Sequence, residues 1–210
     1  MIRRRLLKKQ AGGGCTFVDL GLPSGTKWGT GNICKDANGN YYMGAETDWG
    51  TYISWGNIIG HNEGEDYDFS DANYNNTPGK ALTADIPNND AAHDFALAAL
   101  GAPWHLPTKE QTKELYDNTD TEWVADYNGT GVAGRKFMKK SDHSVFIFLP
   151  ASGYYNGTSL YNRGTYGNYW SSSYVSSTDA YYLYFNSSNV NPQYNYRSYR
   201  RYGRTVRPVQ

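Results

Sequence analysis

Few side chains in this 210-residue chain are placed for acid–base or metal chemistry. The histidines are His61, His93, His105 and His143, and no pair has the spacing of zinc ligands. Asp142, His143 and Ser144 are adjacent, but a catalytic triad is defined by geometry in the fold rather than by adjacency. No glycine-rich loop precedes a helix in phosphate-binding form. We therefore predict surface or structural histidines, no catalytic residue, no metal ligand and no cofactor, so that the chain is not an enzyme.

The segment 61–76 is rich in acidic residues. They are Glu63, Glu65, Asp66, Asp68 and Asp71. A calcium loop is one interpretation, because hard cations prefer several carboxylates. The spacing does not match an EF-hand, and acidic stretches usually lie in solvent. We therefore interpret this segment as a solvated loop.

Tyrosine is concentrated in the last part of the chain. Thirteen of the 20 tyrosines lie within residues 151–210, among Asn, Ser, Gly and Arg. A core does not need this composition, because Leu, Ile and Val bury area without a hydroxyl to satisfy. Exposed tyrosine with Ser, Gly and Asn is instead typical of an antibody paratope. The alternatives are an aromatic surface without a ligand, or tyrosines packed under loops.

Strand alternation assigns faces to some of these tyrosines. In residues 181–185, Leu183 and Phe185 mark the core face. Tyr182 and Tyr184 are therefore expected to point outward, and Tyr194 and Tyr196 also share parity with each other.

Local patterns predict the elements that hold this region. They are a strand over 16–20, a turn at 23–25, a return strand over 26–28, a turn at 38–40, a short strand over 52–55, helices over 90–100 and 109–118, and strands over 144–149, 181–185 and 205–209. Residues 88–90 offer an N-cap to the first helix, and Thr108 with Gln111 has the form of a capping box at the second. Strand, two helices, then strands predicts an α+β domain.

Composition narrows the function classes. The chain has 20 basic and 20 acidic residues, so no net charge draws it to nucleic acid or membrane. Arginines interleave with tyrosines over residues 194–207, which leaves nucleic-acid stacking as an alternative, but the charge balance argues against it. No run approaches the ~20 apolar residues of a membrane span, and the basic N-terminus lacks the apolar region of a signal peptide. Cys15 and Cys34 permit one disulfide but no disulfide scaffold. Residues 1–15 are predicted to be a basic tail and glycine linker, and residues 16–210 one domain with 151–210 as its binding region.

Four ordered motifs resemble the Fibrobacter succinogenes major paralogous domain family. They are the opening FVDLGLPSGTKW at 17–28, WHLPTKE at 104–110, YWSSS at 169–173 and RTVRPV at 204–209. The resemblance covers nearly all of residues 16–210. It implies a C-type-lectin-like fold, related to the formylglycine-generating-enzyme fold, with two helices packed on short, mostly antiparallel sheets in a loop-rich domain.

A narrower resemblance is to the variable proteins of diversity-generating retroelements, in which adenine-directed mutagenesis rewrites Asn-type codons near the end of the gene. Asn, Tyr, Ser, Asp and Arg are all reachable from such codons. The ligand-binding positions that this resemblance implies are Asn156, Tyr161, Asn162, Tyr166, Tyr174, Ser176, Asp179, Tyr182, Tyr184, Tyr194, Tyr196, Tyr199, Arg200 and Tyr202. Trp170, Leu183, Phe185 and Val206 lie between them as expected fixed positions.

The chain departs from the functional motifs of related proteins. It has neither the Glu-Pro-Asn or Gln-Pro-Asp motif nor the Trp-Asn-Asp motif of calcium-dependent sugar-binding lectins, and Asn191-Pro192-Gln193 lacks a carboxylate. The late cysteines of the oxidase relatives are also missing. Cys34 differs in position from the cysteine that many family members carry after the first tryptophan.

These observations predict a receptor-recognition or adhesin module that displays a diversified Tyr/Asn/Ser/Arg surface to a protein or glycan on a cell. The location stays open, with a phage tail tip and a bacterial cell surface as the two candidates. The alternatives are a surface or carbohydrate-binding module that is not diversified, and a relative of the formylglycine-generating oxidases. Ligand identity and oligomeric state stay open.

Overall fold

The computed structural model describes residues 8–9, 16–188 and 193–210, and side chains over 16–188 and 196–210. The strands are β1 (Lys8–Lys9), β2 (Thr16–Val18), β3 (Trp28–Gly29), β4 (Ile33–Lys35), β5 (Tyr41–Met43), β6 (Thr119–Val124), β7 (Gly134–Lys139), β8 (Asp142–Pro150), β9 (Tyr154–Asn156), β10 (Ser159–Tyr161), β11 (Tyr166–Tyr174), β12 (Asp179–Asn186) and β13 (Gln193–Tyr199). The helices are α1 (Asp71–Tyr74), α2 (Phe95–Leu100) and α3 (Lys109–Asn118), with 3-10 turns η1 (Pro78–Ala81) and η2 (Tyr127–Gly129).

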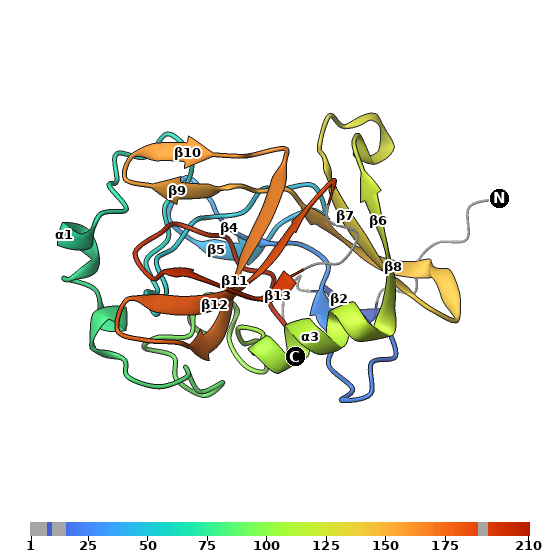
Figure 1. The fold of residues 1–210 in the computed structure, drawn as a ribbon, viewed down its shortest axis with the longest axis horizontal. Coiled ribbons are helices and arrows are strands. Elements are labelled where there is room, and N and C mark those ends of the chain that lie inside the picture. Colours follow the sequence, from blue (N-terminus) through green and yellow to red (C-terminus); the bar gives the residue numbers. More distant parts are fainter. Residues whose placement is uncertain (1–7, 10–15, 189–192) are drawn as a thin grey trace.

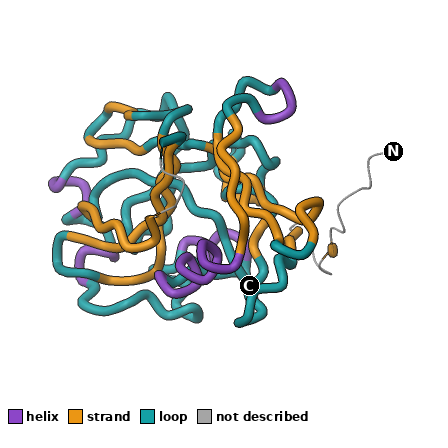
Figure 2. Tube along the Cα trace, turned by 45° about the vertical axis from the view of Figure 1, so that its right-hand side comes forward, coloured by secondary structure: helices purple, strands orange, loops and turns teal. Residues whose placement is uncertain are grey.

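The fold is mostly β, and the predicted α+β, C-type-lectin-like fold with two helices packed on the sheets is wrong. Strands account for 37% of the described residues and helices for 14%. The helices α1, α2 and α3 have only four, six and ten residues. Loops join the small sheets, as the tube in Figure 2 shows. The sequence pattern overestimated the length of α2, because residues 91–93 lie in a turn and the helix begins at Phe95 rather than near Asp90.

Five small antiparallel sheets contain the strands of the described residues. Their strand orders are β1-β2-β3, β4-β5, β6-β7-β8, β10-β9 and β11-β12-β13. In Figure 1, β6, β7 and β8 lie toward one end of the molecule and the β9–β10 hairpin toward the other, with β11, β12 and β13 between them. The strand expected over 205–209 is absent from these ladders; Thr205 and Val209 instead make isolated bridges to other segments.

The β11–β12 pair is buried on both faces. Tyr169, Leu183 and Phe185 join one core cluster, which also contains Leu115 of α3 and Phe137 of β7. The residues that join the second cluster are Trp170, Ala180 and Tyr182, together with Ile53, Trp55, Phe95 and Val206. Adjacent residues on a strand point to opposite faces, so Tyr169 and Trp170 enter different clusters. This sheet is therefore a central layer with a core on each side.

The two longer helices begin at well-satisfied N-caps. Thr108 accepts a hydrogen bond from the backbone N–H of Gln111, and the Gln111 side chain accepts one from the Thr108 N–H, which confirms the predicted capping box. The carboxylate of Asp94 caps α2 by accepting from the N–H groups of Ala96 and Leu97. Asp94 is fully buried and also accepts from the Leu106 N–H at 2.9 Å, so it joins α2 to the segment that leads into α3.

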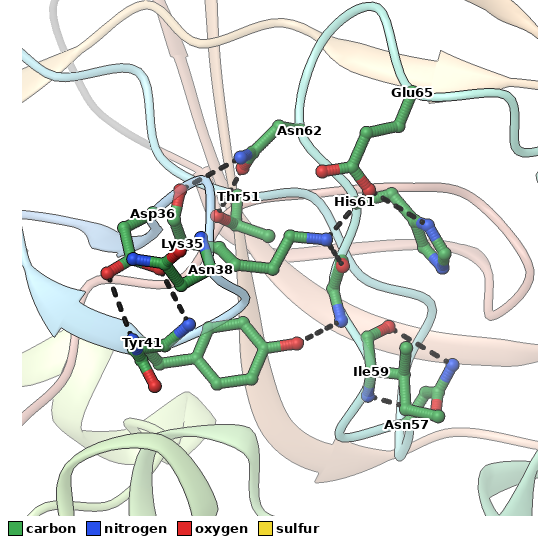
Figure 3. A network of polar contacts seen from close by, with 12 residues as sticks. Lys35, Asp36, Asn38, Tyr41, Thr51, Asn57, Ile59, His61, Asn62 and Glu65 are labelled. Atoms are coloured by element: carbon green, nitrogen blue, oxygen red, sulfur yellow. Dashed lines mark hydrogen bonds and ion pairs between the residues drawn. The ribbon is translucent and has the colours of Figure 1, made fainter.

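A polar network ties the acidic segment 61–76 to the β4–β5 hairpin (Figure 3). The Lys35 ammonium donates to the Gly60 carbonyl at 2.8 Å and to the Glu65 carboxylate at 2.7 Å. The Tyr41 hydroxyl accepts from the Gly60 N–H at 2.8 Å. Two more carboxylates of the segment form ion pairs, Glu63 with Arg163 and Asp71 with Arg201. These acidic side chains therefore serve as ion-pair partners.

None of the described helices is both long and apolar enough to cross a membrane.

Replacing Asp94 with Ala tests the connection between α2 and the segment before α3. The change removes the α2 cap and leaves the buried Leu106 N–H unpaired, so the free energy of unfolding should fall by about 2–4 kcal/mol. Urea denaturation measures it. Asp90→Ala is the control, because its side chain is 26% exposed and pairs with His93. That variant should lose less than about 1 kcal/mol. Equal losses in the two variants would contradict the role given to Asp94.

Candidate functional site

Three exposed tyrosines lie over the C-terminal part of the fold, each packed on a half-buried tyrosine. Tyr161, Tyr196 and Tyr199 are 44%, 40% and 47% exposed. The pairs, with the distance between ring centroids, are Tyr161 on Tyr154 at 5.6 Å, Tyr196 on Tyr184 at 4.8 Å and Tyr199 on Tyr202 at 5.5 Å. We call these six residues the tyrosine surface. Ring-on-ring packing restricts the outer side chains before any ligand arrives, which lowers the entropic cost of binding.

A depression of about 190 Å³ lies among the half-buried members of this surface. Five tyrosines, two asparagines, one serine and Arg204 line it. Among the described residues, no acidic and no aliphatic side chain takes part in the lining. The depression thus combines aromatic faces, hydroxyl and amide groups, and one cation.

Arg204 and Tyr182 are buried residues of the lining, and they form the floor of the depression, next to the core. Arg204 is 1% exposed and Tyr182 is 7% exposed. The Arg204 guanidinium carbon lies 4.0 Å from the centroid of the Tyr182 ring and 4.6 Å from that of Trp170. Burial lowers the pKa of Arg204, and the neighbouring Tyr182 opposes that effect. Arginine nevertheless stays protonated in proteins, so the floor carries a positive charge.

The fourteen residues predicted from sequence are spread over two regions. Asn162, Tyr166, Tyr182, Tyr184 and Tyr202 line the depression. Tyr161, Tyr196 and Tyr199 are the exposed tyrosines, and each contacts a tyrosine of the lining rather than lining the depression itself. Tyr174, Ser176, Asp179 and Arg200 lie together elsewhere, where Ser176 and Asp179 form a turn and Arg200 contacts Tyr174. Asn156 lies on β9 outside the depression, and the Tyr194 side chain lies outside the described residues.

Two of these fourteen residues, Tyr182 and Arg200, are buried. The expectation that Tyr182 points outward is wrong, although it does lie on the face of β12 opposite Leu183. That face packs against the second core cluster, so strand parity alone does not place a side chain in solvent. Tyr184, on the same face, is half-buried, and its hydroxyl accepts from the Asn186 amide at 2.8 Å.

Arg200 is fully buried and acts as a structural connection. Its guanidinium donates to the backbone carbonyls of Leu82 and Ser176 at 3.1 Å, and to that of Gly79. The guanidinium carbon also lies 4.5 Å from the Trp55 ring centroid. It therefore joins the end of β13 to the η1 turn.

Sequence reasoning missed four residues of the depression, Tyr154, Asn168, Ser198 and Arg204. Tyr154 belongs to the tyrosine-rich region and could have been included on composition. Arg204 lies in a motif interpreted as a closing strand, and no local pattern distinguishes an arginine beneath aromatic rings from one in solvent.

The histidines have separate local partners. His93 pairs with Asp90 at 2.7 Å, His143 with Asp120 at 2.7 Å, His105 with the Leu106 carbonyl at 2.8 Å, and His61 stacks on Tyr67 with centroids 3.5 Å apart. The Asp142 carboxylate accepts from the Ser144 hydroxyl at 2.6 Å, so Asp142, His143 and Ser144 do not form a proton relay in sequence order.

Cys34 is a free, buried thiol, and Cys15 lies outside the described residues. Burial, with a further contribution from the neighbouring Asp48, raises the pKa of Cys34 to about 12. The thiolate is the nucleophilic form of cysteine, so Cys34 is not prepared for chemistry at neutral pH.

Comparison with known proteins gives a match in the C-terminal part of the chain. A family model described as a domain of unknown function (DUF8237) matches residues 122–209. The match includes the tyrosine surface and Arg204 but covers less than half of the chain, so the chain is similar to this family over that segment. No curated protein and no solved structure matches the chain.

Substituting a buried tyrosine of the floor should lower the free energy of unfolding more than substituting an exposed tyrosine of the surface. Tyr182→Ala should lower the free energy of unfolding by about 3 kcal/mol or more, because it leaves a cavity beside Trp170. Tyr196→Ala should cost no more than about 1 kcal/mol, since it removes a 40% exposed ring and its contacts with Tyr184 and Tyr182 but leaves no buried cavity. Urea denaturation compares the two variants. A small loss for Tyr182→Ala would place that ring in solvent after all.

The Cys34 thiol should resist alkylation in the native protein. With its pKa near 12, iodoacetamide at pH 8 should modify it at least about a hundredfold more slowly than in the urea-unfolded chain. Peptide mass spectrometry reads Cys34 separately from Cys15. Equal rates in the folded and unfolded chains would mean that Cys34 is accessible and ionised.

Proposed function

We propose that the chain is a ligand-binding module, in which a mostly β scaffold presents the tyrosine surface to a protein or glycan on a cell. The observation that carries this proposal is the set of three exposed tyrosines, each packed on a half-buried one around a depression above Arg204. Contiguous exposed aromatic groups are uncommon on proteins without a partner. Tyr and Arg are also enriched among the residues that dominate binding energy.

The second part of the proposal is that this surface is diversified, as in the variable proteins of diversity-generating retroelements on a phage tail tip or bacterial surface. Support comes from the way buried and exposed residues alternate along the C-terminal part of the chain. The expected fixed positions, Trp170, Leu183, Phe185 and Val206, are at most 1% exposed. The exposed tyrosines are separated from them by half-buried rings, so substitutions at the outer positions would leave the core intact.

Sequencing this gene across its native population tests the second part. We expect substitutions at Tyr161, Tyr196 and Tyr199 and constancy at the four fixed positions. Tyr182 and Arg200 should vary least among the fourteen positions, because both are buried. Substitutions scattered evenly over the gene would contradict diversification and leave the binding proposal to be tested separately.

Removing the outer rings tests the binding proposal. The triple variant Tyr161→Ala, Tyr196→Ala and Tyr199→Ala should lose at least about tenfold in binding. Flow cytometry of the labelled chain on bacterial cells, with protein and glycan arrays, measures it. Tyr42→Ala is the matched control, because Tyr42 is 46% exposed but lies on β5, outside the tyrosine surface. Its binding should be unchanged. Equal binding by the triple variant and the native chain would contradict the proposal.

A further inference from the structure

Arg204 differs from the other arginines buried near it in what surrounds its donors. Arg207 donates from Nε to the Asn32 side chain at 2.9 Å and from its Nη atoms to the carbonyls of Gly29 and Phe148 at 3.1 and 2.9 Å. Arg200 likewise donates from both Nη atoms to backbone carbonyls, and its Nε alone is buried without a partner. In Arg204, by contrast, Nε and Nη1 are buried and have no hydrogen-bond partner.

The surroundings of Arg204 stabilise its charge without satisfying these donors. Four aromatic rings, those of Tyr154, Trp170, Tyr182 and Tyr202, have centroids within 5.6 Å of its guanidinium carbon. Such cation–π contacts offset part of the cost of burying the cation. They do not replace the oxygen acceptors that Nε and Nη1 lack. The groups that act on the charge of Arg204 are tyrosines, among which Tyr182 also makes a side-chain hydrogen bond with it, rather than carboxylates. The floor of the depression is therefore a cation whose natural counterion is missing from the described residues.

The shape and lining of the depression select the kind of anion. A carboxylate matches the planar fork of a guanidinium and can accept two parallel hydrogen bonds. The tyrosine hydroxyls and asparagine amides of the lining can donate to the same oxygens. At about 190 Å³ the depression is smaller than the ~300–1,000 Å³ of sites that enclose a whole small molecule, so one side chain is the better fit.

We infer that the depression above Arg204 binds a carboxylate, supplied by an aspartate or glutamate side chain of a protein partner. The inference rests on the proposed function and names the group that the tyrosine surface would take from its ligand. A Tyr/Ser/Asn surface with a central arginine has the composition of a protein-binding paratope. The ion pair between Arg204 and the partner's carboxylate would be surrounded by tyrosines, whose contacts with the partner would shield it from water.

Titration of the full chain with a blocked glutamate tests this inference. N-acetyl-glutamate amide is added to the ¹⁵N-labelled protein, with N-acetyl-glutamine amide as its neutral isostere, and NMR follows the Arg204 Nε–H resonance, assigned with Arg204→Lys. We expect a saturable shift of the Arg204 resonance with the glutamate probe, and binding of the glutamine probe that is weaker by at least about tenfold. Equal responses to both compounds, or none at Arg204, would overturn the inference.

Two further probes distinguish the source of the anion. Tighter binding of glucuronate than of the glutamate probe would overturn the assignment to a protein partner in favour of an acidic glycan. Tighter binding of inorganic phosphate would overturn the assignment to a carboxylate. Weaker binding of both probes supports the inference.

Substitution of Arg204 separates a ligand-binding role from a structural one. Arg204→Met should abolish the response to the glutamate probe while leaving the melting temperature equal or higher, because a buried cation with unpaired donors is removed. Arg200→Met should lower the melting temperature, since it strips donors from three carbonyls. If Arg204→Met is destabilised as strongly as Arg200→Met, Arg204 is structural and the inference fails. If it does not fold, Arg204→Lys keeps the charge without the fork, and undiminished glutamate binding in that variant also overturns the inference.

Cell binding keeps this inference distinct from the proposed function. Loss of binding in both the triple tyrosine variant and Arg204→Met supports both. Loss in the triple variant with full binding by Arg204→Met would leave the proposed function standing and overturn the carboxylate site.

Discussion

The segment 204–210 is the constraint on which the rest of the structure depends. It belongs to none of the strand ladders, yet its backbone bonds to widely separated parts of the chain. The partners, from its first residue to its last, are Ile53, Trp170, Ile33, Gly29, His105 and Lys27. Arg207, in the middle of the segment, adds side-chain bonds to Asn32, Gly29 and Phe148. Because buried backbone groups must be paired, one extended segment that satisfies so many loops fixes how the small sheets lie against one another.

The same segment gives two arginines opposite environments. Arg204 and Arg207 are three residues apart, so in an extended chain their side chains point to opposite sides. On one side, Arg207 donates hydrogen bonds from Nε and both Nη atoms to oxygen acceptors, so it acts as a structural connection. On the other side Arg204 meets the aromatic rings of β11 and β12, which accept its charge but leave two donors unpaired. The extended backbone of this one segment thus places Arg207 in the core and Arg204 beneath the tyrosine surface.

Local features were predictable from sequence, whereas features that depend on distant contacts were not. The capping box at Thr108 and the boundaries of α3 follow from a few neighbouring residues, and the structure has them as predicted. The concentration of tyrosine on one part of the fold also follows from composition. The N-cap of α2 was misplaced because Asp90 and Asp94 are equally good cap residues locally, and only the Leu106 N–H, twelve residues away, favours Asp94. The burial of Tyr182 depends on a second core cluster that no strand pattern reveals. The prediction of an α+β fold was wrong because it also rested on a local pattern. The periodic apolar residues over 90–100 form a turn and a six-residue helix rather than one long helix.

The tyrosine surface has a graded structure, and the gradient has a physical basis. The outer rings rest on half-buried rings, and of these Tyr184 lies on Tyr182, which packs on Trp170 in the core. A change at the outside alters contact with a ligand and removes one or two ring contacts. A change at the floor alters core packing and the environment of a buried cation. Electrostatic interactions strengthen as water is excluded, so an acidic group that reaches Arg204 would gain more than one that meets an arginine in solvent. A surface organised in this way separates the positions that can change from the position that gives the bound group its charge.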